Sequence, residues 1–227
     1  IRASYWAMCD LIDEQVGRML DVLEQTGQAG NTIVIFTSDH GEMLGDHGIY
    51  LKGPFFYDCA IRVPLIVKPA GATKRRRINE PAGLEDLAPT ILAQLGVVGD
   101  DEGLMTGRDL SPYLSGGRLE GGERGFHCDS VLPTQYGCNP LPAVMSGWHK
   151  YIETNEPELY DLENDPGELT NLIDDEPELA ETLRARLSDI VESQGDDKRA
   201  DRVVMDEESR RLIQGLGYVG GGTDLAL

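Results

Sequence analysis

The chain has no long apolar segment, and this absence excludes one class of protein. None of its apolar stretches approaches the roughly 20 residues that an α-helix needs to cross a bilayer. The opening residues Ile1 and Arg2 are not followed by the basic and then apolar pattern of a secretory signal peptide. We therefore expect no membrane partner.

Lysine is scarce, and one sign of charge dominates. The chain has 40 acidic and 20 basic residues, which give a net charge of −20. Such an excess repels a nucleic-acid backbone, so we expect no nucleic-acid partner. A surface adapted to high salt is favoured over an ordinary acidic surface. The basic run Lys74–Arg77 is interpreted as a solvated loop, with substrate steering as the alternative.

The cysteines indicate neither a zinc site nor a disulfide scaffold. Cys9, Cys59, Cys128 and Cys138 include no C-x-x-C pair, which argues against a zinc site. Four cysteines among 227 residues do not make a disulfide scaffold. Cys9 and Cys59 are predicted to pack as small apolar side chains, and Cys138 is predicted to lie in a loop.

The most informative segment is residues 33–53, IVIFTSDHGEMLGDHGIYLKG. Its apolar start predicts a buried parallel strand, which ends at Asp39 and His40. In open α/β sheets, ligands bind just past the carboxyl ends of the strands. A carboxylate and an imidazole there can hold a divalent metal, and Lys52 can hold an anion beside it. The apolar residues around Lys52 predict partly closed surroundings.

Periodic patterns predict the other elements and an α/β fold. Helices are expected at 4–26, 84–95 and 176–193, and strands at 32–38, 62–68, 125–132, 142–153 and 157–162. The apolar stripe of the first helix is predicted to pack in a core. A boundary near residue 105 separates a larger mixed sheet from a small α+β subdomain with an antiparallel sheet. The tail from Gln194 is expected to wrap back or fray.

Several ordered motifs resemble the sulfatase family of the alkaline phosphatase superfamily. They are SDHGEMLGDHG with LKG, IRVPLIVKPAG at 61–71, the helix sequence at 5–27, HKYIE at 149–153, ELYDLENDPGELTNL at 158–172 and RRLIQGLGYVG at 210–220. The resemblance implies that residues 1–105 are the C-terminal portion of an alkaline-phosphatase-like catalytic domain, a mixed sheet flanked by helices. Residues 106–227 would be the small C-terminal antiparallel-sheet subdomain with its helix and tail.

The resemblance also implies a sulfuric ester hydrolase that cleaves a small sulfate ester or a sulfated sugar. Asp39 and His40 match metal ligands, and we expect Ca²⁺ ahead of Mn²⁺. Lys52 matches the lysine that bridges the sulfuryl group and the leaving oxygen, a catalytic and substrate-binding role.

One family motif is missing from the chain. Relatives carry a C-x-P-S-R or S-x-P-S-R segment whose first residue becomes the formylglycine nucleophile. Here Cys138-Asn139-Pro140 imitates its opening, but Leu141 follows. We therefore expect a C-terminal fragment that is inactive alone, with formylglycine supplied by an absent N-terminal half. A cytoplasmic location is slightly favoured. Export stays open, because the true N-terminus is expected to lie in the absent half. The sequence leaves the oligomeric state open.

Alternatives remain at the level of function and of single residues. The chain could belong to a phosphonate monoester or phosphodiester hydrolase of the same superfamily, or be a non-catalytic truncated homologue. Asp39 could merely cap the loop while His40 packs against Tyr57. For His47 a structural role is favoured over proton donation, and Arg62 is expected to be architectural.

Overall fold

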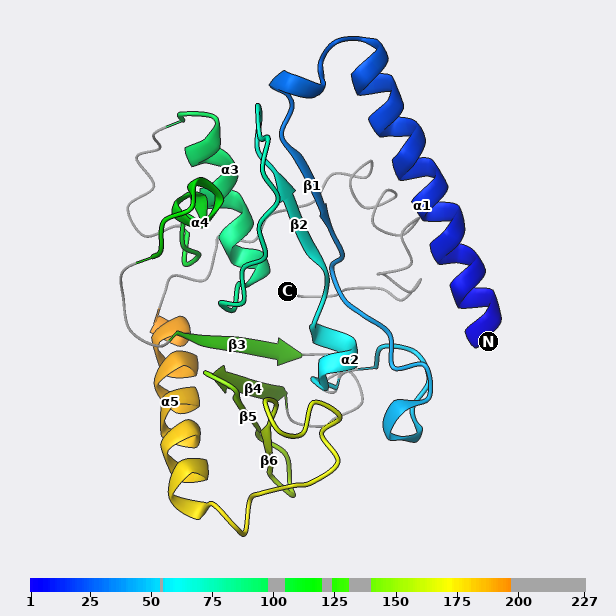
Figure 1. Ribbon diagram of the computed structural model, residues 1–227. Helices are drawn as coiled ribbons and strands as arrows, with labels where there is room; N and C mark the ends of the chain where they lie inside the picture. The colour runs from blue at the N-terminus through cyan, green and yellow to red at the C-terminus, as the bar shows by residue number, and fades with distance from the viewer. Residues whose placement is uncertain (54, 98–104, 120–123, 131–139, 197–227) are drawn as a thin grey trace, which may run out of the picture. The chain divides into compact units, whose positions relative to one another are not determined.

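The computed structural model describes residues 1–53, 55–97, 105–119, 124–130 and 140–196 (Figure 1). The chain divides into two compact units, residues 1–184 and 185–227. Helix α5 (Pro177–Asp196) crosses that division, and most of the predicted tail lies outside the described residues. Cys138 also lies outside them, and the domain boundary near residue 105 stays a prediction. No helix in the described part is both long and apolar enough to span a membrane.

The first sheet pairs β1 (Val34–Thr37) with β2 (Leu65–Lys68). The two strands are antiparallel, with Val34 opposite Lys68 and Thr37 opposite Leu65. The prediction of a buried parallel strand at 33–36 was wrong, because β1 is only half-buried and Phe36 is exposed. A short apolar run favours a strand, but it does not encode the direction of the neighbouring strand.

Helix α1 (Arg2–Gln25) forms where periodicity predicts it, and the chain turns after it at Gly27, whose φ is +70°. Its apolar stripe is not core, however. None of its residues is buried, and Leu11 and Met19 are both more than half exposed. Helical periodicity specifies which face needs cover, but not which segment supplies it.

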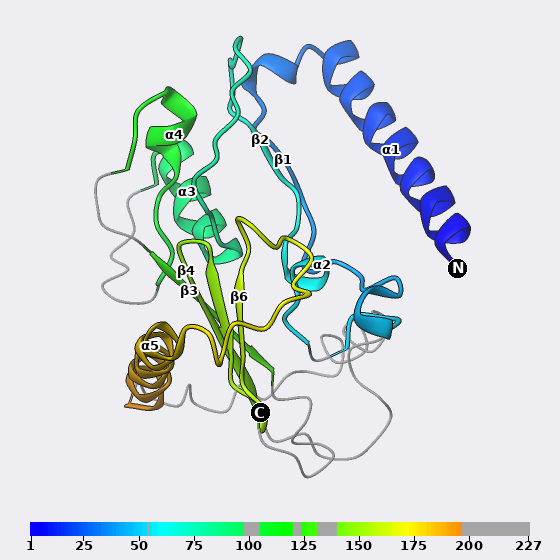
Figure 2. The same ribbon diagram turned by 60° about the horizontal axis from the view of Figure 1, so that its bottom comes forward.

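The second sheet has four antiparallel strands in the order β3 (Gly125–Ser130), β4 (Leu141–Ser146), β5 (His149–Ile152) and β6 (Glu158–Asp161) (Figure 1). Figure 2 shows β3, β4 and β6 of this sheet from a second direction. The prediction of a single strand at 142–153 was wrong, because these residues form the two strands β4 and β5 of a hairpin. Ser146 pairs with His149, and Gly147 takes a φ of +57° in the turn between them. Glycine adopts that conformation without steric cost.

The described part also contains three shorter α-helices, α2 (Asp58–Ile61), α3 (Leu87–Gln94) and α4 (Ser111–Ser115), and three 3-10 helices, Ala29–Asn31, Asp46–Gly48 and Leu84–Asp86. Asp86, directly before α3, is fully buried and accepts hydrogen bonds from the backbone N–H of Gly83 and Arg108. Arg124, next to β3, pairs with the same carboxylate at 2.5 Å. This buried ion pair links the α3 region to the start of the second sheet.

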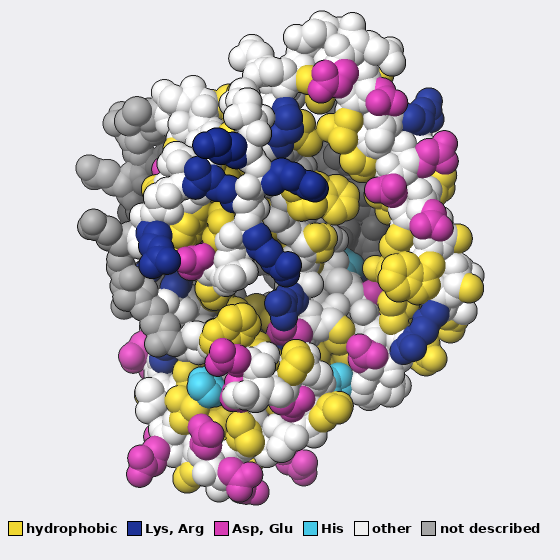
Figure 3. Space-filling model, viewed as in Figure 1, with side chains coloured by type: hydrophobic (Ala, Val, Ile, Leu, Met, Phe, Trp, Pro, Cys, Tyr) yellow, Lys and Arg dark blue, Asp and Glu magenta, His cyan; other side chains and the backbone are white. Residues whose placement is uncertain are grey.

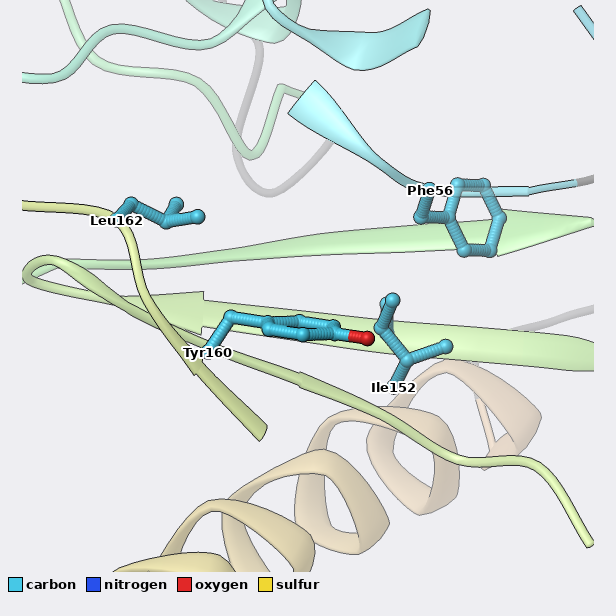
Figure 4. Packing of buried hydrophobic residues seen from close by; sticks show 5 residues of the cluster. Phe56, Ile152, Tyr160 and Leu162 are labelled. Atoms are coloured by element: carbon cyan, nitrogen blue, oxygen red, sulfur yellow. The ribbon is translucent and has the colours of Figure 1, made fainter. Parts of the chain in front are cut away.

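The core beside the second sheet includes a residue from the loop that follows β1. Phe56 is buried with Ala143, Ile152, Tyr160 and Leu162 (Figure 4). Burying one such aromatic side chain contributes about 1.5–3 kcal/mol. The end of the loop that follows β1 is therefore anchored on the second sheet.

Candidate metal and anion site

The segment after β1 turns sharply and brings a carboxylate next to an imidazole. The Ser38 hydroxyl donates to the His40 carbonyl at 2.7 Å, and the His40 backbone N–H donates to Asp39 Oδ1 at 2.9 Å. Asp39 Oδ2 lies 3.6 Å from His40 Nε2. The Asp39 side chain is 65% exposed and the His40 side chain 37% exposed, so the pair faces an open side of the described structure.

The two ring nitrogens of His40 have different partners. Nδ1 lies 2.8 Å from the Gly41 carbonyl oxygen, and Nε2 lies 2.8 Å from Lys52 Nζ. A carbonyl can only accept and an ammonium can only donate, so the proton is assigned to Nδ1. Nε2 is thus left with its lone pair. Metal-binding histidines are commonly oriented by such a carbonyl contact on the other nitrogen.

The structure therefore brings Asp39, His40 and Lys52 to one place, although Lys52 is 12 residues from His40. Their roles stay predictions. Lys52 is half-buried, and of the apolar residues that follow it Phe56 is buried and Tyr57 half-buried, which agrees with the partly closed surroundings predicted for it. Leu51, on its other side in the sequence, is 73% exposed.

The connecting loop is conformationally strained. Among the described non-glycine residues, positive φ angles occur at Leu44, His47, Leu51 and Glu168, three of which lie in this loop. Each such residue costs of the order of 1–3 kcal/mol and persists only where its surroundings enforce it. Strain of this kind is concentrated at functional sites.

Tyr57 helps to hold the loop. Its ring stacks on His47, with centroids 3.8 Å apart and planes 8° apart. His47 thus has a packing contact, in line with the structural role favoured for it, and the ring contact of Tyr57 is with His47 and not with His40. The Tyr57 hydroxyl donates to Glu158 Oε2 at 2.9 Å, and burial together with this carboxylate raises the pKa of Tyr57 to about 12.

Helix α2 holds the segment that follows Asp39 and His40 through backbone hydrogen bonds. The backbone N–H of Gly41 donates to the Ala60 carbonyl at 2.6 Å, and that of Glu42 donates to the Cys59 carbonyl at 3.0 Å. A Cβ atom at Gly41 would lie 2.1 Å from the Cys59 oxygen, so only glycine allows this approach. Cys59 also lies 3.2 Å from the fully buried Met43, and burial raises the pKa of its thiol.

One buried lysine next to this region was missed by the sequence analysis. Lys150 on β5 donates to Asp58 Oδ1, Glu168 Oε1 and the Phe56 carbonyl oxygen at 2.6–3.0 Å. A signal existed, since a lysine directly before Tyr151 and Ile152 in a predicted strand is an unusual core residue. Arg62 Nη1 lies 3.5 Å from Asp58 Oδ2, with its side chain 64% exposed, and its architectural role stays a prediction.

The pair Asp39 and His40 fits a divalent cation as part of a coordination shell. Two donor atoms 3.6 Å apart can both contact one ion at bond lengths of about 2.0–2.6 Å. No group of three or more His, Cys, Asp or Glu residues in the described part could hold a metal ion. Further ligands would have to come from elsewhere.

The basic run is exposed, as predicted. Figure 3 shows Lys and Arg side chains gathered over the stretch between β2 and α3. Arg76 and Arg77 line a hollow of about 330 Å³ together with Tyr113 and Arg118. This basic hollow is distinct in composition from the Asp39 site.

Comparison with known proteins places these features in one family. The sulfatase family model matches residues 1–97. Arylsulfatase K of Bos taurus is 32% identical over 205 residues, covering 84% of this chain and 36% of that protein. The multifunctional alkaline phosphatase superfamily protein PehA of Trinickia caryophylli is 34% identical over 193 residues, covering 77% of this chain and 37% of that protein.

Solved structures agree with the fold. A crystal structure assigned as a sulfatase, from Bacteroides thetaiotaomicron, matches with a TM-score of 0.71 and 29% identity over 88% of this chain and 44% of that one. A phosphonate monoester hydrolase from Silicibacter pomeroyi matches with a TM-score of 0.62 and 27% identity over 81% of this chain and 38% of that one. The chain spans 36–44% of the length of these relatives. It belongs to the sulfatase family and shares the α/β fold of the alkaline phosphatase superfamily.

Proposed function

We propose that this chain supplies the metal-binding and anion-binding residues of a sulfate ester hydrolase. The observation that carries the proposal is the meeting of three side chains. Lys52 Nζ lies 2.8 Å from His40 Nε2, which in turn lies 3.6 Å from Asp39 Oδ2. An ammonium beside a carboxylate–imidazole pair suits a sulfuryl group, whose oxygens need a fixed positive partner.

Each side chain has a definite task in this proposal. The Asp39 carboxylate and the His40 Nε2 lone pair would hold a divalent cation, which stabilises negative charge on the sulfuryl oxygens and the nucleophile when bound. Because Nε2 has a single lone pair, His40 holds either the Lys52 ammonium or a cation. In the second case the Lys52 ammonium would turn toward the anion and donate to a sulfuryl oxygen and the leaving oxygen.

The nucleophile is proposed to lie outside these 227 residues. The chain contains no C-x-P-S-R or S-x-P-S-R segment. We propose that a formylglycine from upstream sequence attacks the sulfur, and that the chain is inactive alone. An upstream coding sequence with this motif, in frame or as a separate gene, would support the proposal. Its absence would favour a non-catalytic homologue.

The test is Lys52→Met in the full-length protein with an aryl sulfate substrate. Removing one donor that stabilises developing charge typically lowers turnover by about 10²–10³-fold. Lys68→Met is the matched control, because its ammonium donates to the Ala29 carbonyl at 2.6 Å, at the opposite end of the β1–β2 pair. Turnover within about threefold of wild type in the Lys52 variant would contradict the assignment.

For the cation we propose Ca²⁺ ahead of Mn²⁺. The Asp39 oxygens suit both ions, whereas the His40 nitrogen is the donor that would favour Mn²⁺. Removing the cation with a chelator should abolish turnover. The ion that restores turnover at the lower concentration, Ca²⁺ or Mn²⁺, would be identified as the bound cation.

A second candidate is hydrolysis of phosphonate monoesters or phosphodiesters. It is supported by the similarity to the phosphonate monoester hydrolase of Silicibacter pomeroyi. The same ammonium and cation would bind phosphoryl oxygens as readily as sulfuryl oxygens. Paired aryl sulfate, phosphodiester and phosphonate substrates would separate the two functions by their ratio of kcat/KM.

A further inference from the structure

Lys150 is a buried cation whose three N–H groups all have partners. Its side chain is 1% exposed, and it donates to Asp58 Oδ1 at 2.6 Å, Glu168 Oε1 at 2.7 Å and the Phe56 carbonyl at 3.0 Å. The Glu168 side chain is 2% exposed and that of Asp58 is 12% exposed. Burying such charges is costly, and an apolar cluster of equal volume would often be as stable. What the charged cluster adds is a fixed geometry.

The cluster fixes the start of α2 in both backbone and side chain. Glu168 Oε2 accepts the Asp58 backbone N–H at 2.6 Å, while Lys150 holds the Asp58 carboxylate and the Phe56 carbonyl. Glu168 itself has a φ of +55°. A glutamate keeps that unfavourable conformation only when its surroundings enforce it.

Both arms of the candidate site end on this anchored segment. The arm with Asp39 and His40 is bonded to α2 through Gly41 and Glu42, whose N–H groups donate to the Ala60 and Cys59 carbonyls. Lys52 precedes Phe56 by four residues in the sequence. Hydrogen bonds therefore join the second sheet through the start of α2 to the segment with Asp39 and His40, and Lys52 meets that segment at His40.

We propose that Lys150 and Glu168 are positioning residues. By holding the start of α2 against the second sheet, they keep Lys52 Nζ within contact distance of His40 Nε2. The inference rests on the proposed function and extends it to residues that touch neither substrate nor cation. Misplacement of a catalytic group by about 1 Å can lower turnover on the order of 10²-fold. The second sheet thus acts as the platform of the site.

The test uses the double variant Lys150→Met with Glu168→Gln in the full-length protein. Lys150→Met alone would leave two buried carboxylates without their cation, whereas the double variant removes one of those charges. In its crystal structure, with divalent cations removed by a chelator, we expect the β3–β6 sheet to be kept and the contact between Lys52 Nζ and His40 Nε2, now 2.8 Å, to exceed 3.5 Å. Lys68→Met, the matched control, should keep the contact under the same cation-free conditions. An unchanged contact in the double variant would overturn the proposal, whether or not the protein hydrolyses sulfate esters.

Kinetics supply a second readout that a purely structural role would not move. We expect kcat to fall at least about 30-fold with KM within about threefold. In a Lys52→Met background the same substitutions should cost less than about threefold, because residues that act through one another are not additive. Equal losses in both backgrounds would contradict the proposal. If the double variant does not fold, the crystal structure and the kinetics are measured on Lys150→Arg instead. This substitution keeps the positive charge but changes the geometry of the hydrogen bonds to Asp58, Glu168 and Phe56.

Discussion

Gly41 is a residue where the fold tolerates little change. Its N–H group bonds to α2, and an added Cβ would lie 2.1 Å from the Cys59 carbonyl oxygen. Gly41→Ala should therefore push the His40 segment away from α2 and lower the free energy of unfolding by about 1–3 kcal/mol. Urea unfolding measures this change.

Gly30→Ala is the matched control for this substitution, because nothing lies within 4 Å of a Cβ there. Its free energy of unfolding should stay within about 0.5 kcal/mol of wild type. Equal effects of the two substitutions would show that the close approach of Gly41 to α2 is not structurally important.

Tyr57 should give the protein a specific sensitivity to alkaline pH. Its pKa is raised from 10.0 to about 12, mainly by burial and then by the hydrogen bond to Glu158. The folded state thus favours the protonated phenol, and this stabilisation is complete below pH 10 and lost as pH rises through 12. The difference in unfolding free energy between wild type and Tyr57→Phe should shrink over that interval. A constant difference from pH 9 to 12 would contradict this account.

The sequence predicted which residues form the candidate site, but not the buried residues that hold the site in place. Asp39 and His40 followed from the end of an apolar run, and the position of Lys52 followed from the family resemblance. Lys150 and Glu168 were missed because they meet Asp58 only through contacts 92 and 110 residues apart in sequence. No local pattern encodes such a meeting.

Helix α1 exposes large apolar side chains that an isolated chain would leave in contact with water. Trp6, Leu11 and Met19 are all exposed on it. Apolar patches of this kind promote association in water. The 227-residue chain expressed alone should therefore self-associate, and Leu11→Lys with Met19→Lys should reduce it in light-scattering measurements. A monomeric wild-type chain at high concentration would contradict this prediction.

At the level of elements, existence was easier to predict than pairing. The helix at 2–25 and the strands at β1, β2, β3 and β6 lie where periodicity indicates them. The strand direction in the first sheet and the hairpin at Gly147 were predicted wrongly. Both depend on which segments meet in space, and hydrophobic period carries no such information.

The net charge of −20 is a property of the whole molecule that should make its stability depend on salt. Self-repulsion opposes the compact state, and ions screen it over about 10 Å at 0.1 M ionic strength and about 3 Å at 1 M. The Tm should therefore rise between 0.1 and 1 M NaCl by a few degrees, on the order of 1 kcal/mol. Calorimetry measures it, and a Tm that falls over this range would contradict a dominant role for self-repulsion.

The central claim is that Asp39 and His40 bind one cation beside Lys52, with the second sheet holding them in place. Anomalous diffraction from crystals of the full-length protein soaked in Mn²⁺ tests it most directly. We predict a peak within about 2.6 Å of both the Asp39 carboxylate and His40 Nε2, with Lys52 Nζ turned away from that nitrogen. A peak that touches neither residue, or Lys52 still 2.8 Å from His40 Nε2 beside a bound ion, would contradict the account.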